Sequence, residues 1–457
     1  MGQVDTAEDI YHILLDQTED DQHEGNIYHQ LGLIKDHQGK YQEALTLYEK
    51  SHAIKQKTLP PNHPDLASSY NNIGLVHDSM GDYPKALSFH EKTLEIKKQS
   101  LPSNHPDLAM SYTNIGLVHY NMGNYPEALL SHEKALEIQQ QSLPPNHPDL
   151  ASSYNNIGSM HDRMGNYPEA LLSHEKALKI KQQSLPSNHP DLAKSYNSIG
   201  LMHGRMGSYP KALLSHEKAL EIQQQLLSFN HPDLATSYNN IGLVHDRMGN
   251  YSKALSYYKK TLEIQQQSLP SNHPNLAKFY NNIGSVHDKM GNYPEALLSH
   301  EKALEIQQQS LPPNHPDLAK SYNNIGLMHC NMGHCLKALS YHEKALVIRQ
   351  QSLPPNHPDL ASSCNNIGNA HAMMGNYPKA LSSYEKALEI KRQSFPPNHP
   401  SLASSYNNTG LVYANMGNYS KAHSFFERAV QIGEQSLPSN HPELQRWRDN
   451  LGRAKNE

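Results

Sequence analysis

The side chains best suited to chemistry in this chain are its 31 histidines, because imidazole binds metal ions and transfers protons near neutral pH. Most of them fall into three sets with a spacing of 42 residues. The first set is His63, His105, His147, His189, His231, His273, His315, His357, His399 and His441. The second is His77, His119, His161, His203, His245, His287, His329 and His371, and the third is His90, His132, His174, His216, His300 and His342.

The spacing of these histidines argues against a metal site. A metal ion needs three or four ligands within about 2 Å, whereas one histidine per repeat gives a ladder with steps on the order of 10 Å. The third set also alternates with Tyr258, Tyr384 and Phe426, so the position accepts any ring. We therefore interpret the histidines as structural, and we predict neither a metal site nor a cofactor.

Other reactive side chains give no stronger signal. Cys330, Cys335 and Cys364 stand where other copies of the repeat have Asp78, Tyr83 and Tyr70, so they are scattered substitutions. The sequence has no glycine-rich phosphate loop and no nucleophile elbow. An active site is asymmetric, and near-identical units offer no asymmetry. We predict that the chain is not an enzyme.

The elements that position these residues come from one repeated unit of 42 residues. The copy at 59–100 reads LPPNHPDLASSYNNIGLVHDSMGDYPKALSFHEKTLEIKKQS. Such a period is typical of stacked arrays in which each unit buries its apolar side against its neighbours. We expect a truncated second helix at 1–16, a divergent repeat at 17–58, nine repeats at 59–436 and a partial capping repeat at 437–457. The start within a repeat also leaves open that the sequence is a piece of a longer protein.

Each unit is predicted to be a pair of antiparallel helices. The first begins at Pro64 and has helical spacing to Met80. Gly81 and Asp82 interrupt it, and a second helix runs from Pro84 to about Ser100. No alternating β-branched run occurs, so we predict an all-α fold without a sheet. The recurrent Gly74 position is expected to allow close approach of the second helix near Ala86.

The composition excludes several classes of partner. The 39 basic and 44 acidic residues give a net charge of −5, which does not favour nucleic acid. No apolar run reaches the 18 or more residues of a membrane span, and the N-terminus does not resemble a secretory leader. Three cysteines cannot form a disulfide framework. We expect a cytoplasmic protein that does not bind membranes.

The unit resembles the tetratricopeptide repeat. The matching residues are Tyr70, Ile73, Gly74, His77, Gly81, Asp82, Tyr83, Ala86 and Leu94. The resemblance implies a right-handed α-solenoid of about ten helical hairpins. The length of 42 residues and the connector resemble kinesin light chain and nephrocystin-3-like arrays. Kinesin light chains also carry a heptad segment that joins the motor subunit, and no such segment is present here, so a motor heavy chain is not an expected partner.

The resemblance also implies a function. First helices of such arrays line a concave groove, in which an asparagine commonly bonds the backbone of an extended peptide. The corresponding residues are Asn72, Asn114, Asn156, Asn240, Asn282, Asn324, Asn366 and Asn408. A competing interpretation is that these asparagines tie neighbouring helices together. The sequence indicates a non-catalytic scaffold for proteins or extended peptides, with two alternatives: a kinesin-light-chain-like cargo adaptor, or the C-terminal binding region of a larger enzyme.

Differences among the copies suggest what the groove binds. Two positions that the resemblance places in the groove become basic in the middle of the array. These residues are Arg163, Lys194, Arg205, Arg247, Lys278, Lys289 and Lys320. Asp162, Asp246 and Asp288 stand beside some of them and partly cancel the field. We therefore expect acidic peptides to be preferred there.

Overall fold

The computed structural model describes residues 2–18 and 20–456, and within these ranges it contains only helices and connecting turns. The chain divides into two compact units, 1–226 and 227–457. The helices of unit 1 are α1 (Gly2–Asp16), α2 (Asp21–His37), α3 (Tyr41–Thr58), α4 (Pro64–Ser79), α5 (Tyr83–Ser100), α6 (Pro106–Asn121), α7 (Tyr125–Ser142), α8 (Pro148–Arg163), α9 (Tyr167–Ser184), α10 (Pro190–Arg205) and α11 (Tyr209–Leu226).

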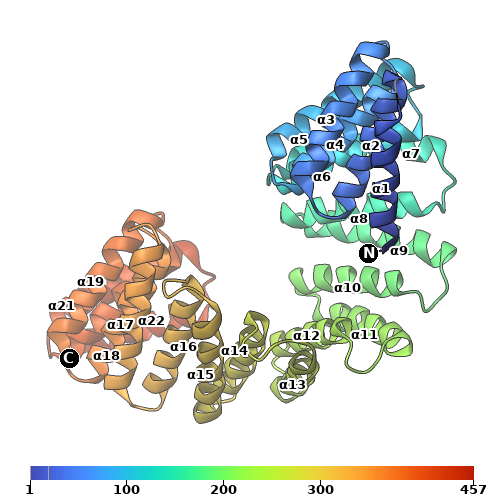
Figure 1. Cartoon of the computed structure of the whole chain (residues 1–457). Helices are drawn as coiled ribbons and strands as arrows, with labels where there is room; N and C mark the ends of the chain where they lie inside the picture. Colours follow the sequence, from blue (N-terminus) through green and yellow to red (C-terminus); the bar gives the residue numbers. More distant parts are fainter. Residues whose placement is uncertain (1, 19, 457) are drawn as a thin grey trace. The chain divides into compact units, whose positions relative to one another are not determined.

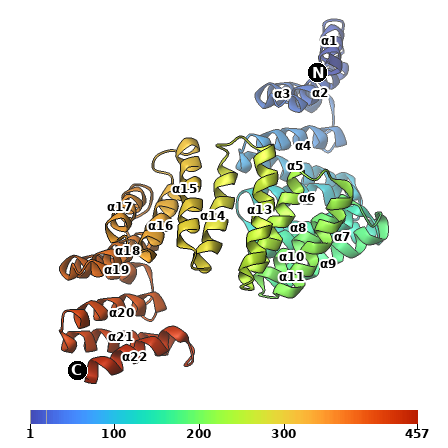
Figure 2. The same cartoon turned by 90° about the horizontal axis from the view of Figure 1, so that it is seen from below.

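Unit 2 continues the same pattern. Its helices are α12 (Pro232–Arg247), α13 (Tyr251–Ser268), α14 (Pro274–Lys289), α15 (Tyr293–Ser310), α16 (Pro316–Asn331), α17 (Cys335–Ser352), α18 (Pro358–Met373), α19 (Tyr377–Ser394), α20 (Pro400–Asn415), α21 (Tyr419–Ser436) and α22 (Pro442–Asn456). Within each unit consecutive helices pack side by side as hairpins (Figures 1 and 2). From α2 on, even-numbered helices are the first helices of the hairpins and odd-numbered ones the second. The predicted all-α repeat fold is confirmed.

From α4 on, most first helices begin with a histidine cap. The Nδ1 atom of His63 accepts a hydrogen bond from the backbone N–H of Asp65 at 3.2 Å, and Pro64 occupies the first turn. Equivalent bonds recur in the later repeats, for example from Asp149 to His147. The cap satisfies one of the N–H groups that have no partner at a helix start. The connector histidines are therefore structural, as predicted, and their specific role is to cap these helices.

First helices end on a glycine with a left-handed backbone. Gly81 has φ +77°, its N–H donates to the carbonyl of Asp78, and the N–H of Asp82 donates to the carbonyl of His77. This is the Schellman arrangement, in which glycine avoids the cost of a Cβ atom at positive φ. It fixes the sharp turn into the second helix in each repeat.

A second glycine brings the two helices of each hairpin together. A Cβ atom built on Gly74 would lie 2.9 Å from Cε1 of the His90 ring. We expected the close approach near Ala86, but the atoms that face the glycine belong to the ring four residues later. The same contact joins Gly242 to Tyr258 and Gly410 to Phe426, which explains why any flat ring is accepted there.

Replacing Lys391 by glutamine is expected to stabilise unit 2 by roughly 1–3 kcal/mol at pH 7. Lys391 is only 7% exposed, and its Nζ donates to the Ser401 carbonyl at 2.9 Å and to Ser405 Oγ at 2.8 Å. Burial lowers the pKa of this lysine to about 8. The corresponding Gln307 already makes a neutral bond, accepting from Ser321 Oγ at 2.6 Å.

The sign of this effect depends on pH. The pKa of Lys391 is lower in the folded state, so the penalty is complete below pH 8 and is relieved as the pH rises towards the unfolded value of about 10.5. Thermal melts of wild type and Lys391→Gln at pH 7 and pH 10 should therefore differ most at pH 7. A glutamine variant that melts below the wild type at pH 7 would contradict this account.

Candidate functional site

One line of side chains on every first helix could contact a ligand. On α14 it consists of Lys278, Asn282, Ser285 and Lys289, which are spaced four, three and four residues apart and so share one side of the helix. We call these four positions, and their equivalents in other repeats, the stripe. Neighbouring first helices are in contact along the stripe. Within each unit, hydrogen bonds join a stripe residue to the residue 43 positions earlier, which lies on the preceding first helix.

The asparagines of the stripe form the first of these links. Asn114 Nδ2 donates to Asn71 Oδ1 at 2.9 Å, and Asn366 Nδ2 donates to Asn323 Oδ1 at 2.7 Å. The bond from Asn282 to Asn239 is longer, at 3.3 Å, and Asn72 lies 3.4 Å from His29. Four of the eight predicted residues therefore tie adjacent first helices together.

This structural use does not exhaust the asparagine side chains. A primary amide has two donors and a carbonyl acceptor, so one interhelical N–H bond leaves the other N–H and the carbonyl oxygen for a ligand. The remaining four predicted residues, Asn156, Asn240, Asn324 and Asn408, make no side-chain hydrogen bond within the described residues. Both interpretations of the asparagines are compatible with this geometry, and peptide binding stays a prediction.

One further asparagine of this kind was not among the predicted residues. Asn450 of α22 donates from Nδ2 to Asn407 Oδ1 at 2.8 Å. It lies 42 residues after Asn408, so the repeat register could have identified it. The clipped last repeat thus continues the stripe of unit 2.

Four of the seven predicted basic residues already have partners within the array. Arg163 donates to the Tyr120 hydroxyl at 2.9 Å, and Arg205 pairs with Asp162. Lys289 Nζ lies 2.7 Å from both carboxylate oxygens of Asp246 in the preceding repeat. Lys194 pairs with Asp191 one turn away on its own helix, at 3.1 Å.

Three basic residues remain available to a ligand. Within the described part of the chain, Arg247, Lys278 and Lys320 form no ion pair and no side-chain hydrogen bond, and all three are exposed. All belong to unit 2, on α12, α14 and α16. Of the seven predicted basic residues, the three without an internal partner therefore lie on α12, α14 and α16, and not throughout residues 163–320.

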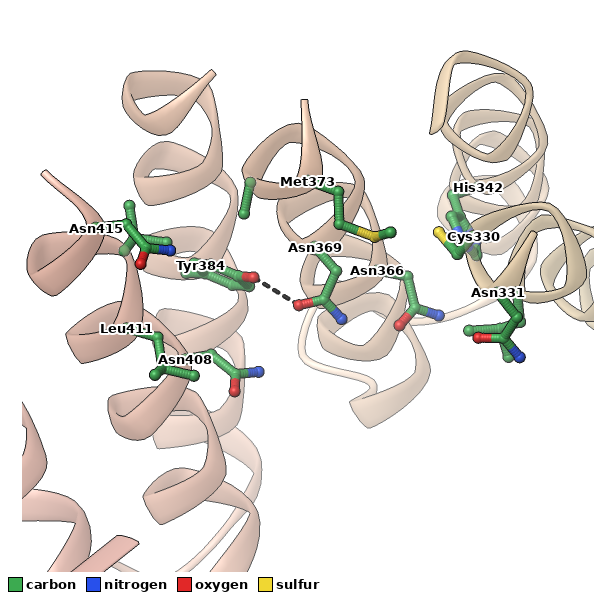
Figure 3. Close-up of a pocket in the computed structure, with 13 residues that line it drawn as sticks. Cys330, Asn331, His342, Asn366, Asn369, Met373, Tyr384, Asn408, Leu411 and Asn415 are labelled. Atoms are coloured by element: carbon green, nitrogen blue, oxygen red, sulfur yellow. Dashed lines mark hydrogen bonds between the residues drawn. The ribbon is translucent and has the colours of Figure 1, made fainter. Parts of the chain in front are cut away.

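A groove of about 460 Å³ follows on the same face, between α16, α18 and α20. Figure 3 shows Asn366 and Asn369 of α18 lying between Asn331 of α16 and Asn408 of α20. Tyr384 reaches the groove from the second helix α19 and donates its hydroxyl proton to Asn369 Oδ1 at 2.5 Å. Of the predicted site residues, the structure brings Asn366 and Asn408 together here.

The histidines of the second helices lie beneath this face and fill the hairpins. Burial lowers the pKa of His90, His132, His216, His300 and His342 to about 4, so these rings are neutral at pH 7. In the ranges that the structure describes, no three histidine, cysteine or acidic side chains converge as metal ligands would. Nor does any helix there have the length and apolar character needed to span a membrane.

Comparison with known families agrees with this architecture. The model of the tetratricopeptide repeat matches residues 23–99, 107–183, 191–267, 233–309, 275–351, 317–393 and 359–435. The chain belongs to the tetratricopeptide repeat family. Arrays of this family are typically scaffolds for protein interactions. No curated protein gives a significant match to the chain.

Several solved structures have a similar fold. BtubC (BKLC) from P. vanneervenii is 23% identical, with a TM-score of 0.44, over 51% of this chain and 94% of that one. A putative kinesin light chain from Podosopora anserina with nearly identical TPR-like repeats is 24% identical, with a TM-score of 0.42, over 46% and 100%. The apo form of RapI is 18% identical, with a TM-score of 0.48, over 62% and 97%.

Proposed function

We propose that the stripe of α12, α14 and α16 binds an extended, acidic segment of a partner protein, and that the chain acts as a non-catalytic scaffold. The observation that carries the proposal is the set of three unpaired cations, Arg247, Lys278 and Lys320, beside the asparagines of the stripe. An exposed cation without an internal partner can pair with a carboxylate of a ligand. The adjacent amides can bond the ligand's backbone.

The spacing of the cations defines the ligand further. Lys278 and Lys320 occupy the same position on successive first helices, which pack about 10 Å apart. An extended peptide rises about 3.3 Å per residue. It therefore advances about three residues per repeat, and acidic side chains at every third position would meet the cations in turn. Asn282 and Asn324 lie one helical turn from the two lysines and face the same peptide.

Fluorescence anisotropy with two labelled peptides, (Glu-Ser-Gly)₄ and (Lys-Ser-Gly)₄, tests this proposal. We expect the wild-type chain to bind only the glutamate peptide, with an affinity that falls as salt rises. Lys278→Glu with Lys320→Glu should weaken binding about tenfold, equivalent to about 1.4 kcal/mol, because attraction is replaced by repulsion at two exposed positions.

A matched control uses the same repeats and the same change of charge. Lys302 and Lys344 lie on the second helices α15 and α17, over the rings of Tyr280 and Tyr322. Lys302→Glu with Lys344→Glu should leave the affinity within about twofold of wild type, since these side chains are not on the stripe. Equal losses in the two double variants would mean that net charge, not the stripe, governs binding, and would refute the proposal.

A further inference from the structure

The stripe changes character towards the end of unit 2. On α18 it reads Ser362, Asn366, Asn369 and Met373, and on α20 it reads Ser404, Asn408, Leu411 and Asn415. None of these side chains carries a charge. The residue that directly precedes the fourth stripe residue in the sequence is aspartate on α4, α8, α12 and α14. On α16, α18 and α20 it is Cys330, Ala372 and Ala414. The groove between these three helices is therefore lined by uncharged residues, with His342 neutral at pH 7.

Asn369 supplies the groove with a fixed hydrogen-bond donor. Its position holds leucine or serine in the other eight full repeats, so an amide there is particular to α18. The Tyr384 hydroxyl donates a hydrogen bond to the side-chain carbonyl oxygen of Asn369, so the Asn369 NH₂ group is the part of the amide that can bond a ligand. Because Tyr384 is buried and fixed by packing, it holds the amide in one orientation within the groove (Figure 3).

Two exposed apolar side chains border the same groove. Met373 is 55% exposed and Leu411 is 40% exposed. Met373 stands where Arg163, Arg205 and Arg247 stand on other first helices. The combination offers apolar surface to a ligand in a place with no cation to attract an acidic side chain.

We propose that this neutral groove is a second binding site, and that its occupant is an uncharged, extended segment of a partner protein with one aliphatic side chain. The Asn369 NH₂ group donates to a backbone carbonyl of the segment, and Asn408 bonds the neighbouring peptide group. The aliphatic side chain packs between Met373 and Leu411. A charged side chain is disfavoured, because the groove would strip it of water without offering a counter-charge. The volume of about 460 Å³ suits a short segment of this kind.

The site goes beyond the acidic-segment function and does not depend on it. Apart from α16, which belongs to both, the two sites are formed by different helices. The first favours acidic side chains, whereas the second disfavours charged ones. An extended partner could occupy both sites at once, with an acidic stretch over α12 to α16 and an uncharged stretch over α16 to α20. Either site can fail experimentally while the other stands.

An immobilised decapeptide array probed with the full-length chain tests the proposal. One half of the array holds uncharged sequences of Ser, Asn and Gly with Leu, Met or Ser at the centre, and the other half holds acidic sequences. We expect the wild type to retain the Leu and Met peptides above the Ser peptides. Asn369→Leu and Met373→Arg should each reduce this retention about fivefold or more, with the acidic half unchanged or, for Met373→Arg, increased.

The repeats of the chain already contain the residues that these variants introduce. Leu243 occurs together with Tyr258 in another repeat, which is the combination that Asn369→Leu makes with Tyr384. Arginine occupies the Met373 position on three other first helices. Both variants are therefore expected to fold as the wild type does.

Tyr384→Phe separates the positioning of the Asn369 amide from the packing of the ring. Phenylalanine already occupies the equivalent position, at Phe426. Tyr384→Phe should weaken retention of the Leu peptides while the thermal melt stays cooperative, because the Asn369 amide is no longer held. Lys278→Glu with Lys320→Glu should affect only the acidic half. The proposal is overturned if the uncharged peptides with Leu are retained no better than those with Ser. It is also overturned if the Asn369 and Met373 variants retain them like the wild type.

Discussion

Lowering the pH from 7.5 to 5 is expected to unfold most of this repeat array. Five histidines of the second helices, His90, His132 and His216 in unit 1 and His300 and His342 in unit 2, are buried and have pKa values of about 4. In the unfolded chain a histidine has a pKa of about 6.5. Between these values the unfolded state binds more protons than the folded state, so stability falls as the pH falls.

The expected size of this effect is large. At pH 5 each of these histidines costs on the order of 2 kcal/mol relative to neutral pH. Five of them together approach the total stability of a typical domain, about 5–15 kcal/mol. Circular dichroism as a function of pH should show loss of helix between pH 6.5 and 5, a range in which ordinary carboxylates remain ionised.

A variant taken from the chain's own repeats isolates the cause. Replacing the five histidines by tyrosine or phenylalanine copies Tyr258, Tyr384 and Phe426, which occupy the same position. His132→Phe is the most informative single change, because both ring nitrogens of His132 are buried without a hydrogen-bond partner in the described residues. The variant with all five histidines replaced should stay helical at pH 5. If it unfolds at the same pH as wild type, the buried imidazoles are not responsible.

Replacing Gly158 by leucine is expected to destabilise unit 1 by on the order of 2–4 kcal/mol. A Cβ atom at Gly158 would lie 2.8 Å from Cε1 of His174, closer than such atoms approach one another. The ring is itself buried and cannot move aside without disturbing the hairpin of α8 and α9. Overpacking of this kind outweighs the gain of about 1 kcal/mol from removing a helical glycine.

Gly452→Leu provides the control for this prediction. Gly452 is also helical, but a Cβ atom there would meet nothing within 4 Å. Gly452→Leu should leave the melting temperature unchanged or raise it slightly, while Gly158→Leu should lower it. Hydrogen exchange should localise the loss of protection to α8 and α9. Similar melting temperatures for the two leucine variants would show that close packing against the ring is unimportant.

Most of the helical architecture could be predicted from the sequence, because its signals are local. Proline after histidine, glycine at the turn and proline after Leu101 act within a few residues, and each recurs in nearly every unit. The partner of the recurrent Gly74 was predicted incorrectly in detail. Helical spacing identified the correct helix, but only the packing places the His90 ring, and not Ala86, against the glycine.

The charges of the candidate site could not be assigned in the same way. Asp246 and Lys289 are 43 residues apart, and their pairing follows from how one first helix lies against the next. From the sequence alone, Lys289 counts as one of several basic residues and Asp246 as one of the acidic residues near them, and nothing indicates that the two form a pair. The structure shows that Lys289 is neutralised whereas Lys278, on the same helix, is not. Likewise, the orientation of Asn369 depends on a hydroxyl from another helix, which no local pattern reveals.

The central claim is that the stripe of α12, α14 and α16 receives an acidic segment, and photo-cross-linking tests it most directly. The probe is a (Glu-Ser-Gly)₄ peptide with benzoylphenylalanine at its centre, and cross-linked residues are identified by mass spectrometry on the full-length chain. The account predicts cross-links at stripe residues of these three helices, lost in Lys278→Glu with Lys320→Glu. Cross-links concentrated on the second helices, or on the first helices of unit 1, would contradict it.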